Sequence, residues 1–342
     1  MMKEMKTKDA VGQVLCHDIT VIIKDVKKGV AFKKGHVIEE KDIEVLLSLG
    51  KDNIFIWKKE DGQVHENDAA QILLNLCADE NMNHSDVSEG KIDISAKEDG
   101  LFVVNLDLLN KVNSLGEIII ATRSNYYPVK KNDKLAGTRV IPLIIDEEKL
   151  NMAKDIVKDE KILSLHKFKP HKVGVIATGN EIYYKRIEDT FTPVIAAKLA
   201  EYGSVIETHI VLPDNSNDLT KTINEMLERN DLDMVICMGG MSVDPDDRTP
   251  LAIKNTGAEI ISYGAPVLPG AMFLISYKNG KPILGLPGCV MYAKRTIFDL
   301  MLPRILAGLK ISQKDLRTLG NGGLCLNCDE CTFPNCGFGK GV

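Results

Sequence analysis

The sequence predicts an α/β protein whose main part is a three-layer, doubly wound, mostly parallel sheet. From about residue 171 onward, apolar strand-like segments alternate with segments that carry helix start and stop signals. The first of these segments, 172–178, is almost continuously apolar, as is typical of a strand buried on both faces. Repeated strand–helix units of this kind place helices on both faces of one parallel sheet.

The other elements of this part follow from local signals. Thr192-Pro193 offers a cap and a first-turn proline, Gly203 and Gly257 end helices, and Asn279-Gly280 between apolar runs is typical of a hairpin turn. The further strands are expected at 205–211, 233–238, 273–277 and 282–286, and the helices at 192–203, 215–229, 249–257 and 290–306.

The remaining sequence suggests three more parts. We expect a mixed α+β region over 1–90, a β-rich region with a connecting helix over 91–170, the α/β domain over 171–310 and a Cys-rich tail over 320–342. Within the first two regions the patterns predict strand-like structure at 10–23, 53–57, 116–122 and 139–145, and helices at 42–50, 68–78 and 149–165.

Composition excludes several classes of function. The 342 residues carry a formal charge of −5, with 44% hydrophobic and 27% charged residues, as in ordinary globular proteins. This charge does not favour nucleic acid or an anionic membrane as a partner. No apolar run approaches the length of a membrane span, and the charged first ten residues do not resemble a secretory signal. We therefore expect a cytoplasmic protein.

Three loops follow strands of the α/β domain at the edge where such sheets bind ligands. They are 178–181, 239–247 and 286–289, and they are rich in glycine. Glycine lets the backbone approach a ligand and direct N–H groups at phosphate oxygens, and a helix starting near Val290 would add a favourable dipole. Any one such loop is more often only a turn. The candidate ligand-binding residues are Thr178, Gly179, Gly239, Gly240, Ser242, Pro287, Gly288 and Cys289.

Acidic residues in two of these loops are candidates for catalysis and metal binding. Glu181 and Asp247 are hard oxygen ligands of the type that Mg²⁺ prefers. Asp244 and Asp246 crowd the same loop as Asp247, which favours a metal-linked role for Asp244. Alternatively, Asp247 only stabilises the start of the next helix, and the other two are solvated charges.

The motifs in this order resemble the molybdopterin-binding domain of molybdenum-cofactor synthesis proteins. They are Thr-Gly-Asn-Glu at 178–181, Gly-Gly-Met-Ser-Val at 239–243 and Gly-Lys-Pro-Ile-Leu-Gly-Leu-Pro-Gly at 280–288. The segment 265–270, Ala-Pro-Val-Leu-Pro-Gly, points to the molybdotransferase branch. The resemblance covers 171–308 and extends more weakly to 11–15 and 32–38.

The resemblance implies a pterin and phosphate site at Gly239, Gly240, Ser242, Pro287 and Gly288. It implies Mg²⁺-dependent insertion of molybdate into adenylated molybdopterin. The chain departs from the family pattern, which has glycine in place of Asp244, Asn-Pro in place of residues 289–290 and a large C-terminal β domain. These departures leave open a cofactor carrier or sensor that delivers to a molybdoenzyme and, less favoured, a molybdopterin adenylyltransferase. The sequence is compatible with a homo-oligomer and with either molybdenum or tungsten.

The C-terminal tail contains four cysteines with the spacing C-x2-C-x2-C-x4-C, namely Cys325, Cys328, Cys331 and Cys336. In a reducing compartment such a cluster indicates metal ligands, and both zinc and an iron–sulfur cluster remain open. The tail has no core of its own and lies outside the strand–helix pattern.

Cys289 differs from the other cysteines because a thiolate is favoured at a helix N-terminus. Cys16, Cys77 and Cys237 are expected to be small core residues.

Overall fold

The computed structural model describes residues 2–23, 27–57, 61–242, 244 and 247–341. Contacts divide the chain into two compact units. The first contains the N-terminal residues to 98 together with 104–123 and 131–164, and the second contains 165–342 together with 99–103 and 124–130. The first unit thus includes most of both predicted N-terminal regions, whereas the tail belongs to the same unit as the α/β domain. In the described part of the chain, no helix has the length and apolar character needed to cross a membrane.

The N-terminal part of the first unit is a small antiparallel structure. Strands β1 (Met2–Lys6) and β4 (Asn53–Trp57) pair, as do β2 (Ile19–Ile23) and β3 (Lys27–Phe32), and η1 (Thr7–Asp9) and α1 (Asp42–Ser48) complete it. The prediction of a strand over 10–23 is wrong before Ile19, because Ala10 directly follows η1 and Val14 and Leu15 form only isolated antiparallel bridges, to Val37 and Ile56. The core of this part consists of Ala10, Leu15, Ile19, Ile38, Leu46 and Ile54.

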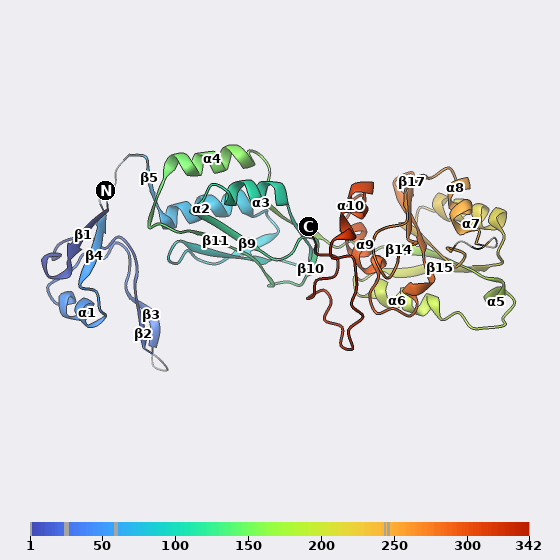
Figure 1. Ribbon diagram of the computed structural model, residues 1–342, viewed down its shortest axis with the longest axis horizontal. Helices are drawn as coiled ribbons and strands as arrows, with labels where there is room; N and C mark the ends of the chain where they lie inside the picture. The colour runs from blue at the N-terminus through green and yellow to red at the C-terminus, as the bar shows by residue number, and fades with distance from the viewer. Residues whose placement is uncertain (1, 24–26, 58–60, 243, 245–246, 342) are drawn as a thin grey trace. The chain divides into compact units, whose positions relative to one another are not determined.

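The rest of the first unit places helices on one face of an antiparallel sheet (Figure 1). The alternating burial along β7 follows from the period of two in a strand, with Ile92, Ile94 and Ala96 buried. The sheet has the order β6 (Met82–His84), β7 (Lys91–Ala96), β11 (Lys134–Val140), β9 (Ile118–Thr122), with helices α2 (Glu66–Cys77), α3 (Leu106–Asn113) and α4 (Glu147–Val157) and the pair β5 (Gln63–His65) and β12 (Ile144–Asp146).

Two predicted elements of this region differ in the structure. The helix expected over 149–165 ends at Val157, where Lys158 takes a positive φ of 54°, and Leu163–Lys167 forms strand β13. The spacing of apolar residues does not distinguish the two structures here, because leucines at 163 and 165 fit a strand as well as a helix. The strand expected over 139–145 is interrupted between Val140 and Ile144. Strand β13 joins β8 (Gly100–Val104) and β10 (Tyr127–Val129) in a sheet of the order β10-β8-β13.

The second unit contains the predicted mostly parallel sheet. Strands β15, β14, β16 and β19 run parallel, and the hairpin strand β18 pairs antiparallel with both β19 and the edge strand β17. The strands are β14 (Lys172–Thr178), β15 (Val205–Leu212), β16 (Met234–Met238), β17 (Glu259–Tyr263), β18 (Leu274–Lys278) and β19 (Lys281–Leu286), in the order β15-β14-β16-β19-β18-β17.

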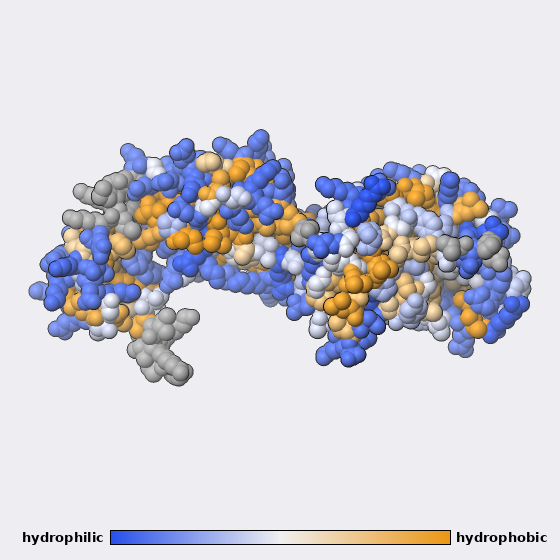
Figure 2. Space-filling model, viewed as in Figure 1, coloured by the Kyte–Doolittle hydropathy of each residue, from blue (hydrophilic) through white to orange (hydrophobic). Residues whose placement is uncertain are grey.

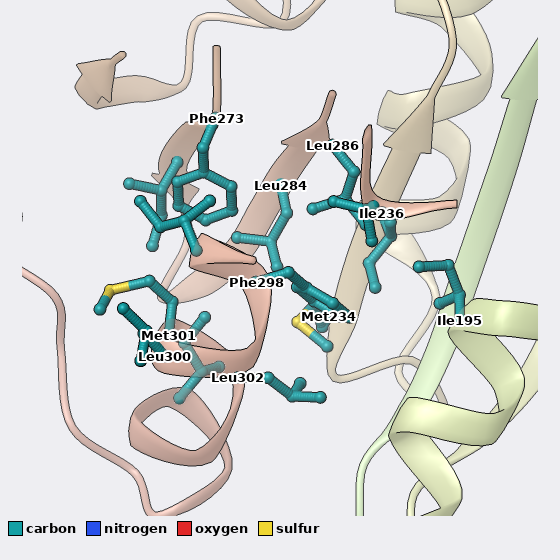
Figure 3. Close-up of a cluster of buried hydrophobic side chains, with 14 of the residues drawn as sticks. Ile195, Met234, Ile236, Phe273, Leu284, Leu286, Phe298, Leu300, Met301 and Leu302 are labelled. Atoms are coloured by element: carbon teal, nitrogen blue, oxygen red, sulfur yellow. The ribbon is translucent and has the colours of Figure 1, made fainter. Parts of the chain in front are cut away.

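Helices cover both faces of this sheet, as a doubly wound fold requires. Along β16, Met234 and Ile236 face one core, whereas Val235 and Cys237 face the other. The first core is drawn in Figure 3, where side chains of α9 lie against those of the central strands. Helices α6 (Phe191–Ala200) and α9 (Ile297–Leu306) contribute to this core, and α7 (Ser216–Glu228) and α8 (Thr249–Asn255) contribute to the opposite one.

Two helices start at residues other than the predicted ones. Helix α6 begins at Phe191 because the Asp189 carboxylate accepts the N–H groups of Phe191 and Thr192, so Thr192 is not the cap. Helix α9 begins at Ile297 rather than near Val290, since Thr296 and Asp299 form a capping box there. The residues between β19 and α9 contain only the short turn η2 (Gly288–Val290), preceded by the extended Pro287.

The C-terminal tail packs onto the α/β domain after α10 (Gln313–Arg317) and η3 (Thr318–Gly320). The Leu268 N–H donates to the Gly323 carbonyl at 2.8 Å, and the Cys325 N–H donates to the Leu268 carbonyl at 2.8 Å. The Phe338 ring is 4% exposed and belongs to the same core as α9. The tail, which the sequence predicts to have no core of its own, thus contributes an aromatic ring to the core of the domain.

Replacing Phe338 with alanine should lower the free energy of unfolding of the second unit by about 3–5 kcal/mol, the usual cost of emptying a buried aromatic site. Urea unfolding followed by circular dichroism measures this change. Leu326→Ala is the matched control, because Leu326 is 79% exposed and its truncation should leave unfolding nearly unchanged. Equal effects of the two substitutions would contradict the packing of the tail.

Candidate functional site

Two threonines join the loops that follow β14 and β16. Thr178, the last residue of β14, is buried and donates from Oγ1 to the Met238 carbonyl at 3.2 Å. Thr249 is 1% exposed, and its Oγ1 donates to the Gly239 carbonyl at 2.7 Å and lies 3.5 Å from Thr178 Oγ1. Sequence reasoning treats Thr249 only as a helix start, since its part in the loop depends on contacts between distant segments.

Thr178 and Thr249 leave no room for side chains at Gly239 and Gly240. Gly239 has a φ of +86°, and a Cβ atom there would lie 2.1 Å from the Thr178 carbonyl oxygen. Gly240 has a φ of +57°, and its Cβ would lie 3.0 Å from Thr249 Oγ1. By contrast, a Cβ on the exposed Gly288 would meet nothing within 4 Å, so the backbone of Gly288 borders open space.

The acidic candidates lie on exposed or half-exposed parts of the same edge. Asp247 accepts the Asp244 N–H through Oδ2 at 3.1 Å, and its own N–H donates to the Asp244 carbonyl at 2.9 Å. Glu181 lies on the short helix α5 (Asn180–Tyr183) and is exposed, as are Ser242 and Asp244. Asp246 lies outside the described residues. Within the part of the chain that the structure describes, no three His, Cys, Asp or Glu residues are grouped so as to hold a metal ion.

Two residues without a sequence motif support these loops. Asp214, which follows β15, accepts the Asn180 N–H at 3.0 Å, and Asn180 Oδ1 accepts the Asp214 N–H at 3.4 Å. The Tyr263 hydroxyl of β17 donates to the Met241 carbonyl at 2.9 Å. Burial, followed by the nearby Asp247 charge, raises the pKa of Tyr263, which therefore remains a hydrogen-bond donor at neutral pH.

Two of the loops that follow strands of this sheet also carry exposed tyrosines. Tyr183 and Tyr184 are 45% and 59% exposed, and Tyr292, in the loop after η2, is 76% exposed. The two loops touch where the Thr190 hydroxyl donates to Met291 Sδ at 3.2 Å. Sequence reasoning missed these tyrosines because no spacing marks them. They provide flat apolar surfaces on which a planar ring can stack.

Cys289 does not have the predicted environment. The residue is half-buried in η2, and burial raises the pKa of its thiol above the ordinary value. The predicted thiolate is wrong because α9 starts at Ile297, so no long helix begins near this sulfur. Burial likewise raises the pKa of Cys16 to about 11 and of Cys77 and Cys237 to about 12, which agrees with their expected place in the core.

Cys289 should consequently react slowly with iodoacetamide at neutral pH. A raised pKa keeps the thiol protonated, so the alkylation rate should increase with pH and reach its midpoint above 9.0. Peptide mass spectrometry of the folded chain measures the rate at this one cysteine, and the urea-unfolded chain is the control. A midpoint well below the ordinary thiol value would contradict this environment.

The four tail cysteines share one cavity of about 230 Å³. Cys325 and Cys336 are half-buried and pack against the core, whereas Cys328 and Cys331 are exposed. Another cavity, of about 420 Å³, lies at the opposite edge of the sheet, lined among others by His171, Asp233 and Lys281. None of the predicted site residues lines that second cavity, and its place where the parallel strands begin is not where such sheets bind ligands.

Comparisons with known proteins match this part of the chain. Residues 174–307 match a family model described as a probable molybdopterin binding domain, and residues 4–58 match a domain of unknown function. A protein of Pyrobaculum arsenaticum is 36% identical over 86 residues, 25% of this chain and 32% of that protein. A molybdopterin molybdenumtransferase of Staphylococcus epidermidis is 29% identical over 123 residues, 34% of this chain and 29% of that protein. The chain thus spans about a third of these relatives.

Solved structures show a weaker likeness. A molybdopterin biosynthesis enzyme from Thermus thermophilus has 19% identity and a TM-score of 0.33, over 40% of this chain and 97% of that chain. A molybdopterin biosynthesis protein from Pyrococcus horikosii has 16% identity and a TM-score of 0.32, over 72% of this chain and 79% of that chain. Scores this low add no argument to the sequence match.

The sheet order and the glycine-rich loops at its carboxyl edge define a doubly wound α/β domain of the ligand-binding class. Residues 174–307 match the family described as a probable molybdopterin binding domain, the family that the loop motifs resemble.

Proposed function

We propose that this protein acts in molybdenum-cofactor biosynthesis and binds molybdopterin at the carboxyl edge of the β15-β14-β16-β19 sheet. The observation that carries the proposal is the position of the glycine-rich loops at that edge, within the stretch 174–307 that matches the molybdopterin-binding family. The proposed reaction is Mg²⁺-dependent insertion of molybdate into adenylated molybdopterin.

The loop backbone suits the phosphate of such a ligand. Gly288 borders open space, and Gly239 and Gly240 have positive φ values and are half-exposed, so the backbone of these loops is accessible at the edge. Ser242 is exposed and adds a hydroxyl donor, and Thr178 and Gly179 form the neighbouring wall. The residues present therefore fit an anionic ligand bound mainly by backbone.

Tyrosines would bind the other end of the ligand. A pterin is flat and partly apolar, and Tyr292 is an aromatic ring with 76% of its surface free at this edge. Tyr292→Ala should weaken molybdopterin binding about fivefold, the effect of losing roughly 1 kcal/mol of ring stacking. Fluorescence titration measures the Kd, and Tyr292→Phe, which keeps the ring, should bind like the unchanged chain. Equal losses in both variants would show that the hydroxyl rather than the ring matters.

Glu181, Asp244 and Asp247 would hold Mg²⁺ together with oxygens of the substrate. Mg²⁺ commonly keeps several waters and takes only one or two carboxylates from the protein, so a preformed cage is not required. The exposed carboxylates of Glu181 and Asp244 are free to turn toward a metal, and Asp247 holds the backbone of Asp244 in its loop. Mg²⁺ would supply Lewis-acid stabilisation of charge on the phosphate and molybdate oxygens.

Asp247→Asn should lower the Mg²⁺-dependent turnover of adenylated molybdopterin by at least about tenfold, or about 1.4 kcal/mol, while the fold is preserved. The amide keeps an oxygen for the Asp244 N–H but loses the charge that attracts the metal. Anaerobic product analysis at several Mg²⁺ concentrations measures the change, with Glu225→Gln on the exposed face of α7 as the control. Unchanged kinetics would remove Asp247 from the metal site.

A cofactor carrier is the second candidate function. It is favoured by Asp244, whose carboxylate replaces the family's glycine beside the phosphate loop, and by the protonated Cys289. The same assay separates the two functions, since a carrier would bind cofactor with no Mg²⁺-dependent product. The recipient would then be a molybdoenzyme.

A further inference from the structure

The cavity in the C-terminal tail has the form of a site for a group larger than one ion. Its volume is about 230 Å³, and all four tail cysteines line it. We propose that this cavity holds a four-iron, four-sulfide cluster bound by Cys325, Cys328, Cys331 and Cys336. The proposal is independent of the function proposed above, because it concerns only the tail.

The size of the cavity favours a cluster over a single zinc ion as its occupant. Zinc holds sulfur at about 2.3 Å, so four ligand sulfurs meet within about 3.8 Å of one another and leave no empty space between them. In the described part of the chain, no three His, Cys, Asp or Glu side chains are placed to hold one metal ion directly, and the four tail cysteines instead line a cavity of about 230 Å³. Four cysteines that line one cavity suit a cluster, which separates its ligands with its own iron and sulfide atoms.

The backbone positions the cysteines at both ends of the cavity. The Cys325 N–H donates to the Leu268 carbonyl, and Cys336 packs beside the core that contains Phe338. Cys328 and Cys331 lie between them on an exposed segment, where their thiols are accessible to iron. The tight C-x2-C-x2-C run is typical of iron–sulfur ligands.

The charged residues that line the cavity are also appropriate for a cluster. Four thiolates and four sulfides make the group anionic, and Lys294 and Arg295 both line the cavity. Lys294 Nζ donates to the carbonyl oxygens of Cys328 at 3.1 Å and Asp329 at 2.6 Å, so it holds the cysteine loop in place.

The Arg295 guanidinium lies 5.0 Å from the centre of the Phe333 ring, which helps cover the cavity. Hydrophobic surface gathers over the tail in Figure 2, and Leu324 and Leu326, which also line the cavity, are 62% and 79% exposed. Phe333 and Phe338 add an apolar lining, and the apolar surroundings of a metal site influence its reduction potential.

The test is anaerobic reconstitution of the full chain with iron(II) and sulfide, in parallel with zinc. We expect four irons and four acid-labile sulfides per chain, an electron paramagnetic resonance signal after reduction, and displacement of any zinc. One tightly held zinc that iron and sulfide do not displace would overturn the proposal. So would two irons per chain, or no bound metal at all.

Single substitutions assign the ligands. Cys328→Ser and Cys331→Ser should each lose more than half of the bound iron, and circular dichroism should show an unchanged fold because both residues are exposed. Cys289→Ser is the matched control, since Cys289 does not line the cavity and the iron content of this variant should be unchanged. Equal iron contents in all three variants would overturn the assignment.

Lys294 provides a second readout. Lys294→Met removes both hydrogen bonds to the cysteine loop and should make iron release to a chelator several-fold faster, whereas Lys294→Arg, which keeps a donor, should restore slow release. Identical release rates in the unchanged chain and in Lys294→Met would show that the loop, and the site proposed on it, is not held in this way.

Discussion

The buried carboxylate of Asp299 is the interaction on which both candidate sites depend. Lys198 of α6 contacts it at 2.5 Å and Arg295 at 2.9 Å, and it also accepts the Thr296 N–H at 2.7 Å. A charge in this position is costly unless it is paired and hydrogen-bonded, so the geometry around it is closely determined. Lys198 and Asp299 are both almost completely buried.

This network decides where α9 begins and therefore how the preceding loop runs. Because the helix starts at Ile297, residues 287–296 remain a loop, with Pro287 and Gly288 at the ligand-binding edge and Lys294 beside the cysteine cavity. The Lys198 ammonium also donates to the Lys294 carbonyl at 3.2 Å, which ties the loop to the network directly. The carboxyl edge of the sheet and the tail thus contact opposite ends of one segment.

The Thr178–Gly239 contact is a second constraint, and it is steric. The carbonyl of Thr178 occupies the volume that any side chain at position 239 would need. The contact between the end of β14 and the loop after β16 therefore requires glycine at this position. The exposed backbone of Gly288 is different, because nothing in the protein requires the small residue. In the proposed function, this open backbone is where the ligand would approach closely.

The sequence alone determined the doubly wound domain, because strands such as β14 and β16 are apolar on both faces and only a parallel sheet between two helical layers buries both. The order of the glycine-rich loops was likewise sufficient to indicate the molybdopterin-binding family over 174–307. These features are local in sequence, and short segments specify them. The assignment of individual residues to phosphate, metal or catalysis remains a prediction.

Only the tertiary structure decided the start of α9, the environment of Cys289 and the role of Thr249. Each depends on a partner distant in sequence, as when Asp299 meets Lys198 from another helix. The sequence showed four cysteines at metal-ligand spacing, but only the fold placed them around one cavity, because Phe338 packs into the domain core and the Cys325 N–H bonds to the Leu268 carbonyl. Burial and long-range hydrogen bonds are properties of the assembled chain, and no short segment encodes them.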